Sequence, residues 1–240
     1  MGTLTFHLEP APYFDFSGRH IPVNIIKSAR AKNIKLKVRP SGVVELVLPK
    51  RVSLKNGLAF LQSEQGWIAN AVKDIEPSVA FEDGAVIPIL GKPHTICHTP
   101  HSKRGVWAAD GKILVSGDLP HLPRRVRDWI RREAKIQLTL KTTYYCSLIE
   151  EPVRRITIRD QKSRWGSCSS AGNLNFSWRL FLMPEEVLSY VVAHEVAHLR
   201  HLNHKKEFWD LTEKLFPEME RAKKWIKING TSLHKYDTTN

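Results

Sequence analysis

The densest group of metal-ligating side chains in the sequence lies in the run His-Glu-Val-Ala-His-Leu-Arg-His-Leu-Asn-His, residues 194–204. His194 and His198 are four residues apart, so on a helix their imidazoles share one face and can reach a single ion. Glu195 lies about 100° around the helix from His194, where its carboxylate can reach a water beside the ion without ligating the ion. The spacing predicts a zinc-dependent hydrolase that binds one Zn²⁺ ion and uses Glu195 as its catalytic base.

A catalytic zinc site usually has three protein ligands and one open position. His204 follows His198 by six residues, so it becomes the third ligand if the chain leaves the helix and turns back. Asn203 tolerates the left-handed backbone that such a turn can use. His201 would overshoot the ion, and a carboxylate such as Glu207 normally comes from a separate helix. We therefore favour His204 and keep His201 and Glu207 as alternatives.

A helix is expected to hold the first two histidines, beginning after Pro184 and ending near Leu202. Proline suits the first turn, and the acids Glu185 and Glu186 complement the helix dipole there. The helix also carries an apolar stripe that would anchor it in a core, consisting of Leu188, Val192, Val196 and Leu199.

The other predicted elements divide the chain into two parts and place it in the α+β class. Residues 1–120 are expected to form a strand-rich region with a hairpin at 33–48 and one helix at 53–75, N-capped by Ser53. Residues 121–240 are expected to form the catalytic domain. Further strands are predicted at 86–90, 94–98, 106–108, 113–115 and 154–158, and further helices at 121–148, 205–216 and 218–228. The apolar face of the helix at 121–148 is predicted to consist of Val126, Trp129, Ile130, Ile136 and Leu140.

The amino-acid composition indicates which kinds of partner the protein could bind and in which cellular compartment we expect it. The 37 Lys and Arg against 24 Asp and Glu give a net charge of +13, which favours a polyanionic partner, although a solvated basic surface has the same composition. Three cysteines without a CxxC pair argue against a thiolate zinc site or a disulfide framework. The sequence has neither a signal-peptide pattern at its start nor a long apolar run, so we expect a soluble cytoplasmic protein without membrane contact.

Several separated motifs of the sequence resemble, in the same order, those of the YgjP-like metallopeptidase family, which is related to SprT-like and WLM-type zinc proteins. The motifs are Asp160–Cys168, Asn173–Leu180, Pro184, His194–His198 and Asn203–Trp209. The resemblance extends from about residue 27 to 225 and is sharpest over 155–225. It implies a zincin-like core, in which a small curved sheet packs on the helix with the HExxH motif. It also implies metal ligands at His194, His198 and His204.

A cationic hairpin is predicted just before the metal-binding helix, because residues 159–168 and 173–180 flank the turn sequence Ser-Ser-Ala-Gly. In zincin-like folds a sheet edge beside the metal can accept an extended peptide as an added strand. A guanidinium can also bind a carboxylate or a phosphate in bidentate fashion. The candidate substrate-binding residues are therefore Arg159, Lys162, Arg164 and Arg179.

Three functions remain open on this reading. The preferred one is a metallopeptidase in which Glu195 activates a zinc-bound water. The alternative is a metal-dependent nucleotide phosphohydrolase of the nucleoside triphosphate pyrophosphatase type, with the same metal site and the cationic hairpin holding phosphates. The third is a nucleic-acid-binding module with a structural zinc, against which the open coordination position and the unligated Glu195 argue. The sequence does not define the oligomeric state.

Overall fold

The structure is a computed structural model that describes residues 4–8, 11–39, 41–73, 77–161 and 163–236. Its helices and strands confirm the α+β class. The described chain divides into two compact units after Val79, so the boundary expected after residue 120 falls inside the second unit, just before the helix α3 (Leu122–Ile149). The strands that precede α3 pack against it and share its core, which explains why the chain is not divided there.

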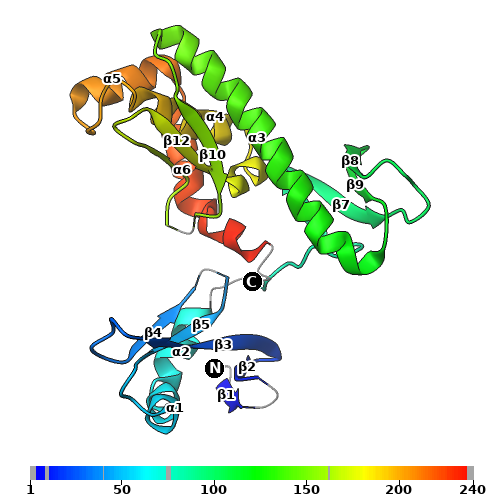
Figure 1. Cartoon of the computed structure of the whole chain (residues 1–240), viewed down its shortest axis with the longest axis vertical. Helices are drawn as coiled ribbons and strands as arrows, with labels where there is room; N and C mark the ends of the chain where they lie inside the picture. The colour runs from blue at the N-terminus through cyan, green and yellow to red at the C-terminus, as the bar shows by residue number, and fades with distance from the viewer. Residues whose placement is uncertain (1–3, 9–10, 40, 74–76, 162, 237–240) are drawn as a thin grey trace. The chain divides into compact units, whose positions relative to one another are not determined.

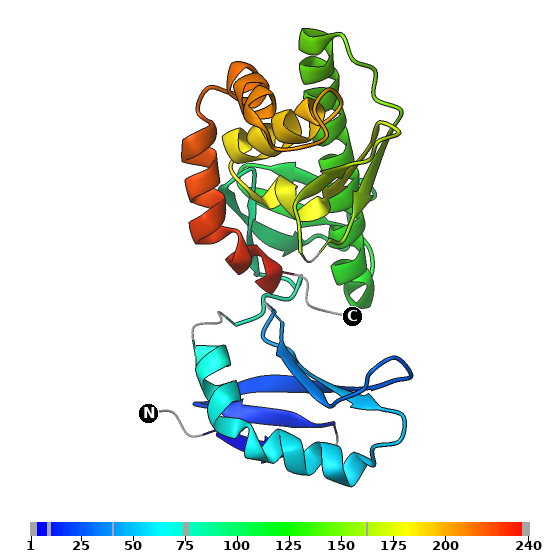
Figure 2. The same ribbon diagram turned by 90° about the vertical axis from the view of Figure 1, so that its left-hand side faces the viewer.

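Unit 1 is a five-stranded sheet with helices on one face (Figure 2). Its strand order is β1 (Leu4–His7), β2 (Tyr13–Phe16), β3 (Arg19–Ser28), β5 (Val44–Pro49) and β4 (Lys35–Val38). Only the β3–β5 pair is parallel. The antiparallel pairing of β4 with β5 confirms the predicted hairpin. Alternate side chains are buried in the core of the unit, among them Phe14, Ile21, Val44 and Leu46.

The single helix predicted at 53–75 is two helices, α1 (Leu54–Ser63) and α2 (Gln65–Lys73). Ser53 caps α1 as predicted, because its hydroxyl accepts the N–H of Asn56 at 3.2 Å. The break falls after Ser63, whose hydroxyl donates to the carbonyl of Phe60 at 2.8 Å. Such a side-chain bond competes with the helical hydrogen bonds and favours a bend.

Unit 2 contains two sheets and most of the helices (Figure 1). The first sheet has the order β6 (Val86–Ile89), β7 (Lys92–His98), β9 (Lys112–Val115) and β8 (Val106–Ala109), close to the four predicted strands. The second has the order β10 (Arg155–Arg159), β12 (Asn173–Ser177) and β11 (Gly166–Cys168). The remaining elements are η1 (Leu119–His121), η2 (Trp178–Leu182), α4 (Glu185–Ala197), α5 (Lys206–Leu215), α6 (Met219–Asn229) and η3 (Thr231–Lys235).

The predicted hairpin before the metal-binding helix is formed by β11 and β12, which pair antiparallel around the Ser-Ser-Ala-Gly turn. Gly172 ends this turn with a φ of +74°, a conformation that glycine adopts without strain. The hairpin is shorter than expected, because residues 160, 161 and 163–165 are not part of a strand. β10 lies on the other side of β12 and is parallel to it.

The long helix α3 crosses unit 2 and packs on α4 and η2. Val126, Trp129 and Ile130 are buried as predicted. Ile136 and Leu140, which were predicted to lie on the same face, are instead 46% and 61% exposed. The core-facing side chains continue at a spacing of four residues instead, through Ala134, Leu138, Thr142 and Cys146.

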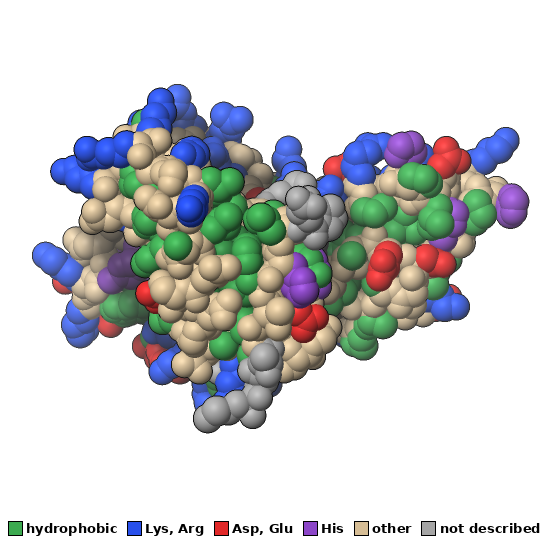
Figure 3. Space-filling view, turned by 90° about the horizontal axis from the view of Figure 1, so that it is seen from below, with side chains coloured by type: hydrophobic (Ala, Val, Ile, Leu, Met, Phe, Trp, Pro, Cys, Tyr) green, Lys and Arg blue, Asp and Glu red, His purple; other side chains and the backbone are tan. Residues whose placement is uncertain are grey.

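The surface agrees with the net charge of +13. Lys and Arg side chains are spread over the face in Figure 3 among fewer acidic ones. No helix among the described residues is both long and apolar enough to cross a membrane.

Candidate metal centre

Helix α4 is enclosed on nearly all sides, which fixes the side chains that it presents. Of its thirteen residues only Glu185, Glu186 and His194 are not buried. A helix that is apolar on all faces belongs inside a core, and α4 packs between α3, α5, α6, η2 and β11. His194 therefore extends from a rigid support.

The chain leaves α4 earlier than predicted, at Ala197 rather than near Leu202, with His198 as the C-cap. Asn203 takes part in the turn that follows, but it is absent from the described residues with positive φ. Its side-chain oxygen instead accepts the N–H of Lys205 at 3.3 Å. The expected return of the chain thus occurs through a side-chain turn, not through left-handed backbone.

Three imidazoles converge where the chain returns. The ligating nitrogens of His194, His198 and His204 all lie within 4.8 Å of one another, and the Nε2 atoms of His194 and His204 are 3.2 Å apart. A tetrahedral zinc with Zn–N bonds of about 2.1 Å places its nitrogen ligands about 3.4 Å apart. This group could hold a metal ion, and among the described residues it includes neither His201 nor Glu207.

The hydrogen bond of His198 and the lowered pKa values of His194 and His198 fit a metal site. His198 donates its Nδ1–H to the carbonyl of His201 at 2.9 Å, which leaves its Nε2 lone pair for a ligand. The Nδ1 atom of His194 is buried without a partner in the described part of the chain. Burial, with the nearby His198, His204 and Lys223, lowers the pKa of His194 to about 3, and burial also lowers the pKa of His198. Both rings are therefore neutral at physiological pH, as metal ligation requires.

Two aromatic residues of α5 support the cluster. Phe208 is fully buried, and its ring centroid lies 4.4 Å from that of His198 and 4.7 Å from that of His204. Trp209 donates its indole N–H to the carbonyl of His204 at 3.1 Å. The Nζ of Lys223, from α6, lies 3.9 Å from the centroid of the Trp209 ring. Contacts from α5 and α6 thus fix the segment that carries the third histidine.

Glu195 lies next to the cluster without being part of it, and only 6% of its surface is exposed. Burial raises the pKa of its carboxyl to about 7, against the opposing effects of the Arg164 charge and a hydrogen bond from the backbone of Cys168. A carboxyl group with a pKa near the working pH is suited to both accepting and releasing a proton. Cys168 is no rival nucleophile, because burial and the charge of Glu195 raise the pKa of its thiol to about 11.

The candidate substrate-binding cations are not equivalent. Arg164 is exposed, and its positive charge lowers the pKa of the Glu195 carboxyl, so Arg164 lies close to the site. Arg159 is exposed and donates to the side-chain oxygen of Asn175 at 2.9 Å. Lys162 lies outside the described residues.

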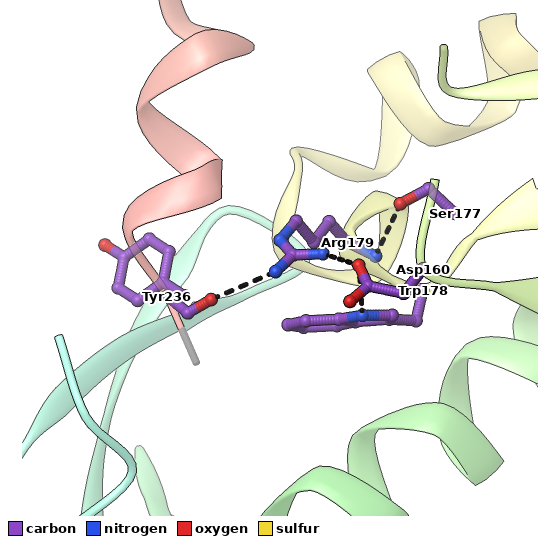
Figure 4. A network of polar contacts seen from close by, with 5 residues as sticks. All are labelled: Asp160, Ser177, Trp178, Arg179 and Tyr236. Carbon is purple, nitrogen blue, oxygen red and sulfur yellow. Dashed lines mark hydrogen bonds and ion pairs between the residues drawn. The ribbon is translucent and has the colours of Figure 1, made fainter. Parts of the chain in front are cut away.

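Arg179 does not fit the substrate-binding role expected from the sequence, because it is only 4% exposed. Its guanidinium forms an ion pair with Asp160 and donates to the carbonyl of Tyr236 at 3.3 Å (Figure 4). It also lies 4.2 Å from the centroid of the Trp178 ring. Arg179 therefore links η2 to Asp160 and to Tyr236.

Gly166 is a part of the site that sequence reasoning missed. A Cβ atom at this position would lie 2.6 Å from both Cγ and Oε1 of Glu195. Nothing in the sequence around Gly166 shows that Glu195 is the group that approaches it.

Gly166→Ala is expected to displace the Glu195 carboxylate and to lower hydrolysis by about 10²-fold, the usual cost of a small misplacement of a catalytic group. Zinc stoichiometry should not change, because no histidine moves. Gly66→Ala is the matched control, since a Cβ there meets nothing within 4 Å. Steady-state rates and metal analysis check both, and full activity of Gly166→Ala would contradict the close packing at Glu195.

Three converging imidazoles beside a buried carboxylate, in an α+β unit, form the arrangement of a metal-dependent hydrolase. Residues 32–229 match the family model described as YgjP-like, metallopeptidase domain. This match spans most of the chain, so the protein belongs to the YgjP-like metallopeptidase family, and the resemblance noted in the sequence is confirmed.

Two other comparisons complete the picture. The chain is similar to the crystal structure of the metallopeptidase zymogen of Pyrococcus abyssi abylysin, with 26% sequence identity. That similarity covers 39% of this chain and 92% of the other, with a TM-score of 0.35. No curated protein matches the chain.

Proposed function

We propose that the protein is a zinc metallopeptidase in which His194, His198 and His204 hold one Zn²⁺ ion and Glu195 is the general base. The observation that carries this proposal is the buried Glu195 carboxylate beside three converging imidazoles to which it does not belong. A purely structural zinc site does not require a buried carboxylate that has a raised pKa and does not bind the metal. This argues against the nucleic-acid-binding module.

In the proposed peptide hydrolysis, Glu195 transfers the proton, and Cys168 and Arg164 influence the charge of its carboxylate. When bound, zinc supplies Lewis-acid chemistry, lowering the pKa of water and polarising the bond to be cleaved. Glu195 takes the proton of the attacking water and later gives it to the leaving amine. The N–H of Cys168 and the charge of Arg164 favour the ionised carboxylate, against the burial that raises its pKa to about 7.

Strand β11 offers an edge on which a peptide could lie. It is an outer strand of its three-stranded sheet. The bonds Ser177 N–H to Trp165 and Ser169 N–H to Asn173 direct the odd-numbered residues of this segment toward β12. The alternation of an antiparallel pair then directs the backbone groups of Gly166 and the carbonyl of Cys168 to the open edge, whereas the N–H of Cys168 is bonded to Glu195. Strand addition there would place an extended peptide beside Glu195.

A nucleotide phosphohydrolase is the second candidate, favoured by the exposed Arg164 next to Glu195 and by Lys223 close to His194. These cations could bind phosphates as readily as a peptide carboxylate. The metal chemistry of the two reactions is shared, so only the substrate distinguishes them.

The zinc-loaded full chain should be assayed in parallel against a quenched-fluorescence peptide library and a panel of nucleoside triphosphates, with Glu195→Gln as the control. We expect cleavage of peptides that Glu195→Gln abolishes. Hydrolysis of nucleotides without any peptide cleavage, lost in the same variant, would replace the peptidase by the phosphohydrolase.

A further inference from the structure

The second half of α3 carries apolar side chains on two opposite sides. Ala134, Leu138, Thr142 and Cys146 form a buried row at a spacing of four residues. A second row is offset from it by two residues, which is about 200° around a helix. This row is largely exposed: Ile136 46%, Leu140 61%, Tyr144 57% and Leu148 53%. A helix that is apolar on both sides is normally covered on both sides.

The exposed row is continuous and nearly uncharged, in a chain of which 25% of the residues are charged. It extends over the thirteen residues from Ile136 to Leu148, whose ends are about 18 Å apart along the helix. Lys141 is the one charged residue between Ile136 and Leu148, and it is bound to Glu185 at 2.6 Å rather than lying in the row. Contiguous exposed apolar surface of this kind marks interaction sites, and the absence of cations in the row argues against a polyanionic partner.

We propose that this row is a homodimer interface, in which α3 of one chain packs antiparallel on α3 of a second copy. The surface is complementary to itself. Beside the apolar ridge run the smaller side chains of Thr139, Thr143 and Ser147, which form a parallel groove. A two-fold axis near the middle of the row places Ile136 opposite Leu148 and Leu140 opposite Tyr144, so each ridge enters the groove of the other copy.

The charges at the two ends of the row select the antiparallel arrangement. The N-terminal end is bounded by the exposed Arg131 and Lys135, and by Arg132, which is paired with Glu133 of the same chain at 3.3 Å. The C-terminal end is bounded by the exposed Glu150, while Glu151 is already paired with Arg200 of the same chain at 3.1 Å. An antiparallel copy sets each basic end over an acidic end, whereas a parallel copy would set like charges together.

Sedimentation velocity of the full chain tests the proposal, up to about 100 μM protein. We expect a species of twice the 27.5 kDa chain mass. Leu140→Asp should weaken the dimer by more than about tenfold, because a charge would be buried at the centre of the interface. Ile228→Asp, at a position 67% exposed on α6, is the matched control and should leave the dimer unchanged. Circular dichroism melts show that both variants fold.

The orientation has its own test. Lys135→Glu should weaken the dimer several-fold, and the combined variant Lys135→Glu with Glu150→Arg should restore it. A monomer at all concentrations, or a dimer unaffected by Leu140→Asp, would overturn the proposal. Failure of the charge-reversed pair to restore association would overturn the antiparallel arrangement. Peptidase activity does not enter these measurements.

Discussion

Glu195→Gln is expected to lower kcat for hydrolysis by about 10²–10⁴-fold, the contribution typical of a general base. Glutamine keeps the shape of the side chain and an oxygen that can accept the backbone N–H of Cys168, but it cannot take a proton. Because Glu195 is not one of the clustered histidines, zinc content should stay at one ion per chain. Single-turnover rates with metal analysis by mass spectrometry measure the two effects separately.

Glu186→Gln is the control for this variant, since Glu186 lies on the same helix but is exposed in its first turn. It should retain the activity of the unmodified protein. Loss of zinc in Glu195→Gln would assign Glu195 to ligation, and unchanged kcat would remove it from the reaction. Either outcome contradicts its role as the base.

His204→Ala is expected to weaken zinc binding by more than about 100-fold, because even residues that merely orient metal ligands cost 10–100-fold when they are removed. Activity should fall with the metal. Zinc should also raise the melting temperature of the unmodified protein, since a ligand at 100 times its Kd adds about 2.7 kcal/mol to the free energy of unfolding. That increase should be absent in His204→Ala.

His201→Ala is the matched control for the third ligand. His201 contacts His198 through its backbone carbonyl, which alanine retains. Its zinc affinity should therefore equal that of the unmodified protein. The reverse pattern, with zinc lost in His201→Ala and kept in His204→Ala, would reassign the third ligand.

The sequence predicted best those residues of the site that lie on one helix, α4, or at its end. His194, Glu195 and His198 are fixed relative to one another by helical geometry, which depends only on spacing. His204 was favoured for its spacing and for the family resemblance, but the manner of the turn was wrong. Asn203 acts through its side chain, and α4 ends five residues before the predicted limit.

Residues that act across the fold could not be predicted from spacing. Lys223 reaches Trp209 from α6, and Gly166 admits Glu195 from β11. Lys223 and Gly166 both lie far from residues 194–204 in the sequence, so no sequence spacing connects them with the histidines. Arg179 was misjudged for the same reason, since its burial depends on pairing with Asp160, nineteen residues away.

Fold prediction failed where local preference and tertiary packing disagree. Strand β3 contains Pro22, and a proline argues against a strand in sequence reasoning. It is tolerated here because Val23 donates to the β2 side, to the carbonyl of Pro12, so the nitrogen of Pro22 faces the opposite side, where the pairing of β3 with β5 begins only at Val23. Ile136 and Leu140 were assigned to the core of unit 2 because apolar residues usually belong there, yet Ala134 and Leu138 occupy that side of α3.

The three histidines differ in how firmly the fold holds them. His194 and His198 are partly buried at the end of an enclosed helix, whereas His204 is exposed in the connection that follows. Displacing residues 199–205 would remove one ligand and leave the other two in place. If the ion is bound as proposed, its exchange is expected to follow this local movement rather than global unfolding, including the release of Trp209 from the carbonyl of His204. Bound zinc raises the free energy of unfolding of the whole chain, whereas the rate of metal exchange depends on the local stability of residues 199–205.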